Sequence, residues 1–381
     1  MTTTVNNEHK NIKVPNLRFP EFQGEWVTYK IKDVLSIGNG RDYKHLNNGG
    51  IPVFGTGGYM TSVDECLYDG ETTFIGRKGS INKPFYYNGK FWTVDTLFYT
   101  HSFNGITPKF TYCLFQTINW LKYNEASGVP SLSKDTIEKI KINIPRLEEQ
   151  NKIAKLMFAL DERIATQNKI IEDLKKLKSA IIEKVFNGKH SEKLQLNDVG
   201  SYIRGLTYSS NDVVEHGGTI VMRSNNIING SLLDYNNNVV FVNKQMSAEQ
   251  QLQNGDVVIC MANGSSSLVG KSSFYDGSCH SPITVGAFCG IYRSKEPIVK
   301  WLFQTNKYRR YIWNSLQGGN GAIANLNGED ILNMSFPIPN ATFKDTCVKM
   351  LTSVDSALEN NMSLCALYTL QKQHMLRQMF I

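Results

Sequence analysis

Two glycine-rich runs have residue types that occur in phosphate-binding loops. One begins at Gly264 and ends in Gly270-Lys271-Ser272, and a Lys-Ser pair after glycine is what a nucleoside triphosphate loop uses. Its glycines, however, are not separated by the four residues that such a loop needs. The other run, residues 53–58, is not clearly followed by a helix. We therefore expect turns in a sheet at both places rather than a nucleotide site.

Carboxylates, histidines and cysteines are not spaced for catalysis either. The pairs Asp64-Glu65 and Glu148-Glu149 lack a nearby Glu-x-Lys, so a metal-dependent nuclease is not indicated. No Asn-Pro-Pro-aromatic or Asp-Pro-Pro-aromatic tetrapeptide of the amino-methyltransferases occurs, and the seven histidines form no HExxH motif. The seven cysteines include no CxxC pair, and we expect Cys279-His280 to be a packing feature rather than a metal site. The pattern favours a binding protein.

Bulk composition sets a broad frame. The chain has 381 residues, 41% of them hydrophobic, which is enough for two or three domains with their own cores. Its net charge of +7 favours a polyanionic partner without requiring one. No stretch reaches the ~20 apolar residues of a membrane span. Residues 1–15 are polar and predict a disordered tail, and the chain is expected in the cytoplasm.

An internal repeat runs through the sequence. Residues 30–43 (KIKDVLSIGNGRDY) match residues 195–208 (QLNDVGSYIRGLTY) at five positions without gaps. Residues 114–117 (LFQT) recur at 302–305, and Ile144-Pro145 recurs as Ile338-Pro339. The offset grows along the chain from 165 to 188 to 194. The second copy therefore carries insertions, as the loops of duplicated domains do.

A long helix follows each copy. Residues 147–186 contain no Pro or Gly, which predicts a helix of about forty residues and roughly 60 Å. Seven-residue spacings give an apolar coiled-coil stripe in this helix and, 194 residues later, in the second one. The stripe includes Leu160, Gln167, Leu174, Val354, Asn361 and Tyr368.

The polar positions of the stripe recur too. Gln167 corresponds to Asn361, and Lys178 corresponds to Lys372. We expect the lysines to extend toward solvent past the end of the stripe. If the helices pair antiparallel, the two amides would meet and hydrogen-bond, fixing the register.

These patterns predict an α/β architecture. Two globular domains, at 16–145 and 188–339, each hold a twisted, mostly antiparallel sheet with short helices, two of them expected at 108–123 and 297–316. They alternate with long helices at 146–187 and 340–381, whose heptad stripes predict a coiled coil. Removal of 341–381 is expected to abolish partner binding before it affects the folding of the domains.

Three segments carry a family likeness. They are residues 14–22 (VPNLRFPEF) with Glu25-Trp26, residues 74–80 (FIGRKGS), and residues 128–133 (GVPSLS) leading through Ile144-Pro145 into the long helix. In combination, and as two tandem copies over nearly the whole chain, they resemble the specificity (S, HsdS) subunits of type I restriction–modification systems.

The resemblance implies a non-catalytic subunit. In that family each globular domain is a target recognition domain that reads one half of a split, asymmetric double-stranded DNA target. The two helices pack as an antiparallel coiled coil, space the halves and dock two methyltransferase (M) subunits, which use S-adenosylmethionine to methylate adenine. Restriction (R) subunits add ATP- and Mg2+-dependent translocation and cleavage. A pair of helices roughly 60 Å long exceeds one DNA turn of ~34 Å, which suits a gapped target.

Candidate DNA contacts lie in loops that hold Arg, Lys, Asn and Tyr. Arg can bind guanine and Asn can bind adenine in the major groove, while lysines and hydroxyls contact phosphates. The counterpart of residues 76–79 is the uncharged run 260–265, so the two domains are expected to read different bases. The predicted DNA-binding residues are Arg41, Tyr43, Lys44, Arg77, Lys78, Arg204, Thr207, Tyr208, Arg223, Asn225, Asn226, Asn263, Ser265, Ser266 and Lys271.

Other interpretations remain open. They are a coiled-coil scaffold that binds proteins rather than DNA, a nuclease or methyltransferase fused to recognition domains, and an orphan specificity protein that no longer acts. The missing catalytic motifs disfavour the fusion. Salt-dependent DNA binding would separate the scaffold from the DNA reader.

Overall fold

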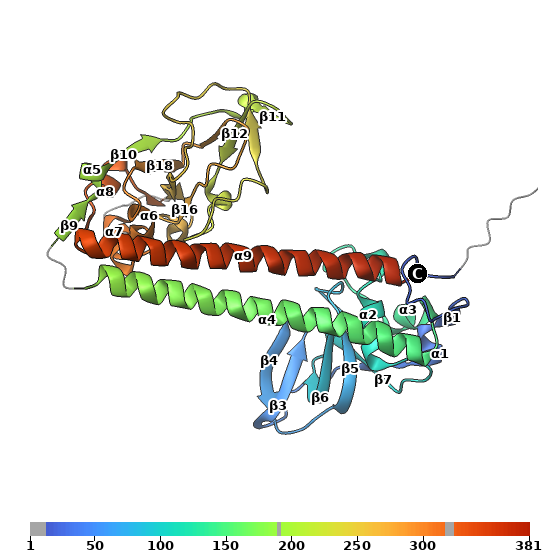
Figure 1. Cartoon of the computed structure of the whole chain (residues 1–381). Helices are drawn as coiled ribbons and strands as arrows, with labels where there is room; N and C mark the ends of the chain where they lie inside the picture. The colour runs from blue at the N-terminus through green and yellow to red at the C-terminus, as the bar shows by residue number, and fades with distance from the viewer. Residues whose placement is uncertain (1–12, 189–191, 317–323) are drawn as a thin grey trace, which may run out of the picture. The chain divides into compact units, whose positions relative to one another are not determined.

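The computed structural model describes residues 13–188, 192–316 and 324–381. Of the expected tail at 1–15, residues 1–12 lie outside the described residues. The chain divides into two compact units. The first joins Met1–Lys169 to Met362–Ile381, and the second is Ile170–Asn361. Each unit therefore contains one globular domain and parts of both long helices, α4 (Leu147–Phe186) and α9 (Ala341–Met379), which Figure 1 labels.

The first unit is built on a six-stranded sheet of order β2-β7-β5-β6-β3-β4. Every pairing is antiparallel except β3 with β6, and β3 to β6 lie side by side in Figure 1. Strands β1 and β8 form a separate antiparallel pair. The strands are β1 (Val27–Lys30), β2 (Ser36–Asn39), β3 (Asn48–Gly55), β4 (Gly58–Val63), β5 (Tyr68–Gly76), β6 (Phe85–Thr93), β7 (Leu97–His101) and β8 (Lys141–Ile144). The short helices are α1 (Ile31–Val34), α2 (Pro108–Phe115), η1 (Trp120–Tyr123) and α3 (Lys134–Lys139).

The second unit repeats this plan with a divided sheet. One four-stranded sheet has the order β10-β18-β14-β16 and another the order β11-β13-β12-β17, in which β12 and β17 are parallel. Pairs β15-β19 and β20-β9 complete it. The strands are β9 (Glu192–Gln195), β10 (Gly200–Arg204), β11 (Val213–Val214), β12 (Thr219–Met222), β13 (Val240–Val242), β14 (Val257–Cys260), β15 (Ala262–Asn263), β16 (Ser272–Phe274), β17 (Ile283–Val285), β18 (Cys289–Ser294), β19 (Ala324–Asn325) and β20 (Ser335–Ile338). The helices are α5 (Leu196–Val199), η2 (Ser210–Asp212), η3 (Ser224–Asn226), η4 (Ser266–Leu268), α6 (Val299–Leu302), α7 (Asn306–Leu316) and α8 (Gly328–Leu332).

The predicted fold class is confirmed, with one correction to the short helices. The helices expected at 108–123 and 297–316 are each interrupted, after Phe115 and after Leu302. In both copies a threonine explains the break. The hydroxyl of Thr117 donates to Leu114 O, and that of Thr305 donates to Leu302 O. A side chain that takes the carbonyl of the preceding turn competes with the continuing helix.

The two long helices pack together within each unit. The start of α4 meets the end of α9 in the first unit, and the end of α4 meets the start of α9 in the second, so they run antiparallel. Every heptad position predicted for the stripe is buried or half-buried. In the first unit, Leu160 is 7% exposed, and the hydroxyl of Tyr368 accepts a hydrogen bond from Arg163 Nη1 at 3.2 Å.

Each helix ends in the core of a globular domain. In the first unit, Phe380 stacks on Phe110 at a ring distance of 5.4 Å and lies edge-on to the buried Trp26 at 6.1 Å. In the second unit, Phe186, which is 194 residues earlier, lies in the core that holds Trp301. The expectation that removal of 341–381 abolishes partner binding before it affects the folding of the domains stays a prediction. Because the last turn of α9 completes the first core, the same truncation should also destabilise the first domain.

The two stripe lysines do not extend into solvent as expected. Lys178 is 6% exposed and pairs through Nζ with Asp355 Oδ1 at 2.7 Å. Lys372 is 8% exposed and pairs with Asp161. The acids are also 194 residues apart, so each unit contains the same ion pair. The hydrogen bond predicted between Gln167 and Asn361, which belong to different units, stays a prediction.

Each lysine also contacts its globular domain. Lys178 Nζ donates to Gly230 O at 2.7 Å, and Lys372 Nζ donates to Gln116 Oε1 at 2.8 Å. A buried ammonium group needs both an opposite charge and hydrogen-bond acceptors. In each unit, one lysine Nζ therefore links the neighbouring long helix to the globular domain. None of the helices among the described residues is long and apolar enough to cross a membrane.

Candidate nucleic-acid interface

In the first unit, segments from three places in the sequence converge on residues 94–96, the first central loop, and on the end of β6 just before it. Arg41 N donates to Thr93 O at 2.8 Å, Val94 N to Phe54 O at 3.1 Å, and Arg77 N to Thr96 O at 2.8 Å. A Cβ at Gly40 would lie 1.9 Å from Val94 O, so only glycine permits this approach. The loops that carry Arg41 and Arg77 therefore flank one short connection.

The second unit repeats the arrangement around residues 286–288, the second central loop. Leu206 N donates to Val285 O at 2.7 Å, Gly286 N to Met222 O at 2.9 Å, and Met261 N to Phe288 O at 2.9 Å. A Cβ at Gly205 would lie 2.2 Å from Gly286 O. Backbone contacts thus match the two copies residue by residue, with Gly40 equivalent to Gly205.

The matched positions carry different side chains. Arg41 corresponds to Leu206, and Arg77 to Met261, which is 3% exposed. Conversely, Arg223 follows Met222 at the place where Gly55, the last residue of β3, follows Phe54. Each central loop is therefore flanked by arginine, but from a different matched position in each domain. A shared scaffold with relocated charge is what two readers of different sequences require.

Most predicted residues of the first domain are available on its surface. Arg41, Lys44 and Lys78 are exposed, and Arg77 is half-buried. The Arg77 guanidinium lies 5.9 Å from the centre of the Phe98 ring and donates from Nη1 to Asp95 O at 3.3 Å. Tyr43 is half-buried against the apolar cluster around Trp92, so its ring supports the loop.

Two of the three segments that carry the family likeness, residues 74–80 and 128–133, meet beside Arg77. Gly79 N donates to Pro130 O at 2.8 Å, and Leu132 N donates to Arg77 O at 2.9 Å. Residues 128–133 thus hold the Gly76–Gly79 loop against the body of the domain. In the second domain, Leu326 N donates to Met261 O at 2.8 Å in the same way.

Three predicted residues of the second domain surround one cavity of about 460 Å3. Tyr208, Arg223 and Asn263 line it together with Ser224 and Phe288. Asn263 Nδ2 donates to Ser224 Oγ at 3.3 Å, and its Oδ1 accepts from Ser265 N at 2.9 Å. Asn225 and Ser265 are exposed nearby in the sequence. This cavity is the strongest candidate for base recognition in the second unit.

Asn226 is a correction to the prediction. It is 1% exposed, and its Nδ2 donates to Asp234 O at 3.1 Å and to Asn237 O at 2.7 Å. Its Oδ1 accepts from Arg223 N at 2.9 Å. With donor and acceptor both occupied inside the fold, Asn226 positions Arg223 and cannot reach a base.

Ser266 and Lys271 lie at a different place from the other candidates. They line a cavity of about 250 Å3 with Arg309 and the exposed Trp313 of α7. These two α7 residues were not predicted. They belong to a stretch in which the second copy is six residues longer, since the offset rises from 188 at Gln304 to 194 at Leu326. The signal in the sequence that could have indicated Arg309 and Trp313 was a helix face with mixed basic and aromatic residues.

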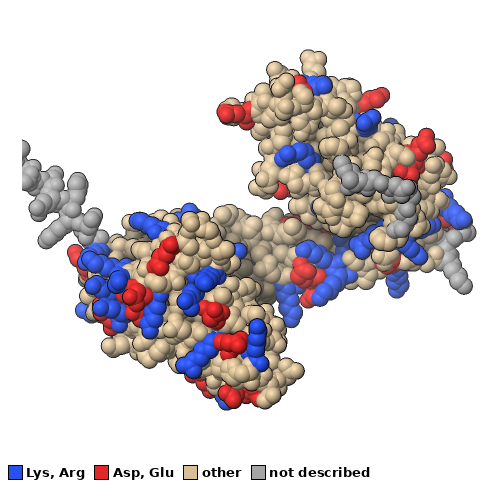
Figure 2. Space-filling view, turned by 180° about the vertical axis from the view of Figure 1, so that it is seen from behind, with Lys and Arg blue, Asp and Glu red and all other residues tan. Residues whose placement is uncertain are grey.

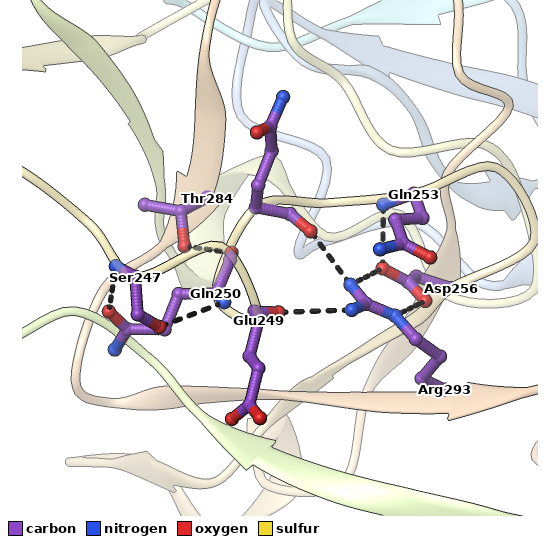
Figure 3. Close-up of polar contacts among 8 residues, drawn as sticks. Ser247, Glu249, Gln250, Gln253, Asp256, Thr284 and Arg293 are labelled. Carbon is purple, nitrogen blue, oxygen red and sulfur yellow. Dashed lines mark hydrogen bonds and ion pairs between the residues drawn. The ribbon is translucent and has the colours of Figure 1, made fainter.

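Arg204 and Thr207 are exposed. An ion pair between Arg293 and Asp256 supports the segment that contacts Arg204. Figure 3 shows Arg293 making a double contact with Asp256, at 2.8 Å and 2.7 Å. Arg293 also donates to Glu249 O and Gln251 O. This fixes the segment whose Gln250 donates from Nε2 to Arg204 O at 3.1 Å. Arg293 is thus a structural cation, unlike the exposed Arg204.

Charge alone does not locate the interface. Figure 2 shows Lys and Arg side chains interspersed with Asp and Glu on the face that it displays. Among the described residues, no group of three His, Cys, Asp or Glu side chains is arranged to hold a metal ion. The segments that flank the two central loops are therefore identified as the candidate interface by their geometry and by the backbone contacts that recur in both domains.

Comparisons with known proteins match both halves of the chain to one family. The model of the type I restriction modification DNA specificity domain matches residues 23–176 and again 189–364. The type I restriction enzyme EcoKI specificity subunit of Escherichia coli K12 is 31% identical over 154 residues, 38% of this chain and 32% of that protein. The MjaVIII specificity subunit of Methanocaldococcus jannaschii is 33% identical over 124 residues, 32% of this chain and 27% of that protein. The chain thus aligns with about a third or less of these two relatives.

A solved structure extends the likeness over the whole fold. The crystal structure of a type I restriction–modification system S subunit from M. genitalium has a TM-score of 0.68 at 15% sequence identity, covering 97% of this chain and 99% of that one. Two globular domains and two packed long helices are therefore a known arrangement. With two successive matches to one family model over most of its length, the chain belongs to the type I restriction–modification DNA specificity family and carries two target recognition domains.

Proposed function

We propose that this chain is the non-catalytic DNA-reading subunit of a type I restriction–modification complex, and that each recognition domain reads one half of a bipartite, asymmetric DNA target. The observation that carries this is the repeated scaffold with relocated arginines. Both central loops keep the same backbone hydrogen bonds, while Arg77 is replaced by Met261 and Gly55 by Arg223. Two copies of one scaffold with different reading side chains suit two different half-sites.

The recognition domains are assigned to residues 16–145 and 188–339, and the helices at 146–187 and 340–381 serve as spacer and docking surface for two M subunits. Support comes from leucines of α9 that the fold leaves in solvent. Leu364, Leu367 and Leu370 are 38%, 62% and 58% exposed. Exposed apolar groups that recur along one helix mark an interaction surface.

Catalysis would then reside in the partners. The M subunits would bind S-adenosylmethionine and methylate adenine, and R subunits would use ATP and Mg2+ to translocate and cut DNA. We place the complex in the cytoplasm, where it meets double-stranded DNA. This chain would contribute the predicted loop residues other than Asn226, and no cofactor site.

Methylome sequencing of cells that express the chain with its M partner tests the proposal. The expected result is adenine methylation at a gapped motif with two unlike halves, present only when the chain is present. Absence of chain-dependent methylation, or a continuous motif, would contradict it.

The alternative, a scaffold that binds only proteins, is favoured by the exposed leucines of α9 and makes a different prediction. Binding to DNA by the assembled complex should weaken steeply between 50 and 200 mM salt if phosphates are contacted, by about a thousandfold for six or more contacts. A scaffold that binds only proteins shows no such dependence.

A further inference from the structure

Phe288 is an apolar ring that the fold leaves in water. It is 67% exposed, although its backbone is firmly held. Its carbonyl oxygen accepts hydrogen bonds from Met261 N at 2.9 Å and from Ala262 N at 3.1 Å. A phenylalanine side chain has only two rotatable bonds, so a ring on a fixed backbone loses little conformational freedom when it meets a ligand.

The same place in the first domain holds a threonine. Thr96 O accepts hydrogen bonds from Arg77 N at 2.8 Å and from Lys78 N at 3.3 Å, the counterparts of Met261 and Ala262. The scaffold therefore does not require an aromatic side chain here. Packing does not require it either, since the residue is 67% exposed.

The surroundings of the ring combine apolar and hydrogen-bonding groups. Phe288 lines the cavity of about 460 Å3 together with Arg223, Asn263 and Tyr208. Arg223 is exposed and is anchored by its backbone N to Asn226 Oδ1 at 2.9 Å. An A·T pair presents a thymine methyl group in the major groove, which apolar side chains contact, beside polar edges that Arg and Asn read.

A wedge between base pairs fits this position less well. Side chains that unstack bases enter a base step and must project beyond their neighbours. Phe288 instead forms part of the wall of a cavity. A ring in that place can receive a methyl group against its face.

We propose that Phe288 reads the C5-methyl group of a thymine in the second half-site, beside the base pair that Arg223 contacts. The proposal rests on the proposed function, because it names a specificity-determining contact of the same interface. Phe288 was absent from the residues predicted from sequence.

Duplexes in which thymine is replaced by uracil test it, because this change removes only the methyl group. The half-site of the second domain is first identified as the half whose sequence preference survives Arg77→Ala. The full chain with its M partner is then titrated with duplexes that carry single uracils in that half. Wild type is expected to bind one uracil duplex about fourfold more weakly than the thymine duplex, the effect of one buried methyl group.

Two variants complete the test. Phe288→Ala should bind the thymine and uracil duplexes equally, while Phe288→Leu, which keeps an apolar surface, should retain most of the preference. Thr96→Ala, the matched change in the first domain, should leave the uracil effect in the second half unchanged. Since Phe288 is mostly exposed, Phe288→Ala is expected to fold.

The outcomes separate the two proposals. If the complex shows no sequence preference on any duplex, the proposed function fails. If sequence preference exists but no uracil in the second half-site weakens binding, if that half contains no thymine, or if Phe288→Ala keeps the wild-type effect, then the assignment of Phe288 is overturned.

Discussion

Arg77 and Met261 occupy the same position in the two domains of this chain. Each donates its backbone N–H to the last residue of a central loop, Thr96 at 2.8 Å and Phe288 at 2.9 Å, and each accepts through its carbonyl from a leucine 2.9 or 2.8 Å away. One side chain is a half-buried cation and the other is buried and apolar. The backbone is thus conserved between the copies while the chemistry offered to a ligand changes.

Arg77→Ala is expected to change the preference for one half-site only. Loss of a bidentate contact to guanine removes about 1–3 kcal/mol of discrimination at one base pair. Methylome sequencing of the variant should show a relaxed position in one half and an unaltered other half. Lys122→Ala, an exposed lysine on η1, is the control and should leave both halves unchanged. Equal changes in both halves would contradict the modular assignment.

Neighbouring asparagines in the second domain are expected to behave differently. Asn226→Ala breaks contacts to Arg223 N, Asp234 O and Asn237 O, so buried groups lose their partners. We expect the free energy of unfolding to fall by about 1–3 kcal/mol. Asn225→Ala, one residue away and exposed, should leave stability unchanged and weaken DNA binding. Urea unfolding and DNA titration of both variants check this, and equal stabilities would refute the structural role of Asn226.

Sequence patterns predicted the helices better than the interface. The absence of Pro and Gly and a heptad stripe are local signals, and α4 covers the range 147–186 that they indicate. The role of Asn226 is not local, because it depends on carbonyls 8 and 11 residues away that the fold brings to its side chain. Its residue type suggested base recognition, but its side chain is buried and hydrogen-bonded inside the fold.

Two other differences have identifiable causes. The lysines of the stripe were expected to reach solvent. The repeat already contained a signal for their pairing, because Asp161 and Asp355 are separated by the same 194 residues as the two lysines. Phe288 was missed because residues 285–290 (VGAFCG) contain none of the Arg, Lys, Asn or Tyr residues by which the candidate loops were selected. Its place is shown by the backbone contacts, which match Val94 with Gly286 and so Thr96 with Phe288.

Asp355→Asn is expected to destabilise the second unit. Asp355 is the partner of Lys178, at 2.7 Å, and of Lys300, at 3.2 Å, and accepts a hydrogen bond from Trp301 Nε1. Asparagine keeps an acceptor for Trp301 but leaves the buried ammonium uncompensated, which costs about 3–5 kcal/mol. Adding Lys178→Met should restore most of this loss. Glu172→Gln, in an exposed pair with Lys175, is the control and should change stability by less than about 0.5 kcal/mol.

The same lysine should make stability depend on pH. Burial lowers the pKa of Lys178 below its ordinary value of 10.5, although Asp355 opposes the shift. The folded chain then releases this proton at a lower pH than the unfolded chain does. Between the folded and unfolded pKa values of Lys178, unfolding takes up a proton. The contribution of this group to the free energy of unfolding therefore increases as pH rises through that range. The difference between wild type and Lys178→Met should shift in favour of wild type toward pH 10.5, and a constant difference would contradict the lowered pKa.

Phe380→Ala should destabilise the first domain although it lies at the far end of the sequence. Phe380 is 7% exposed and packs on Phe110 and Trp26. Truncation of a buried phenylalanine costs about 3–5 kcal/mol. Hydrogen exchange should show faster exchange in residues 26–144 and no change in residues 192–316. Ile381→Ala removes a side chain that is 47% exposed and is the matched control. Unchanged protection of the first domain would mean that its core does not need the last turn of α9.

Leu367→Glu should weaken binding of the M subunit without unfolding the chain. Leu367 is 62% exposed on α9, and the residue 194 positions earlier on α4 is Asp173, so the fold tolerates a carboxylate at the equivalent place. A charge at the centre of an apolar contact is left desolvated and unpaired, which we expect to lower affinity at least tenfold. Thr369→Glu adds a charge of the same sign at an exposed position two residues from Leu367, about 160° away around the helix, and should have little effect. Copurification with the M partner and isothermal titration of both variants measure the difference. Equal affinities would remove the leucines of α9 from the docking surface and leave α4 as its remaining candidate.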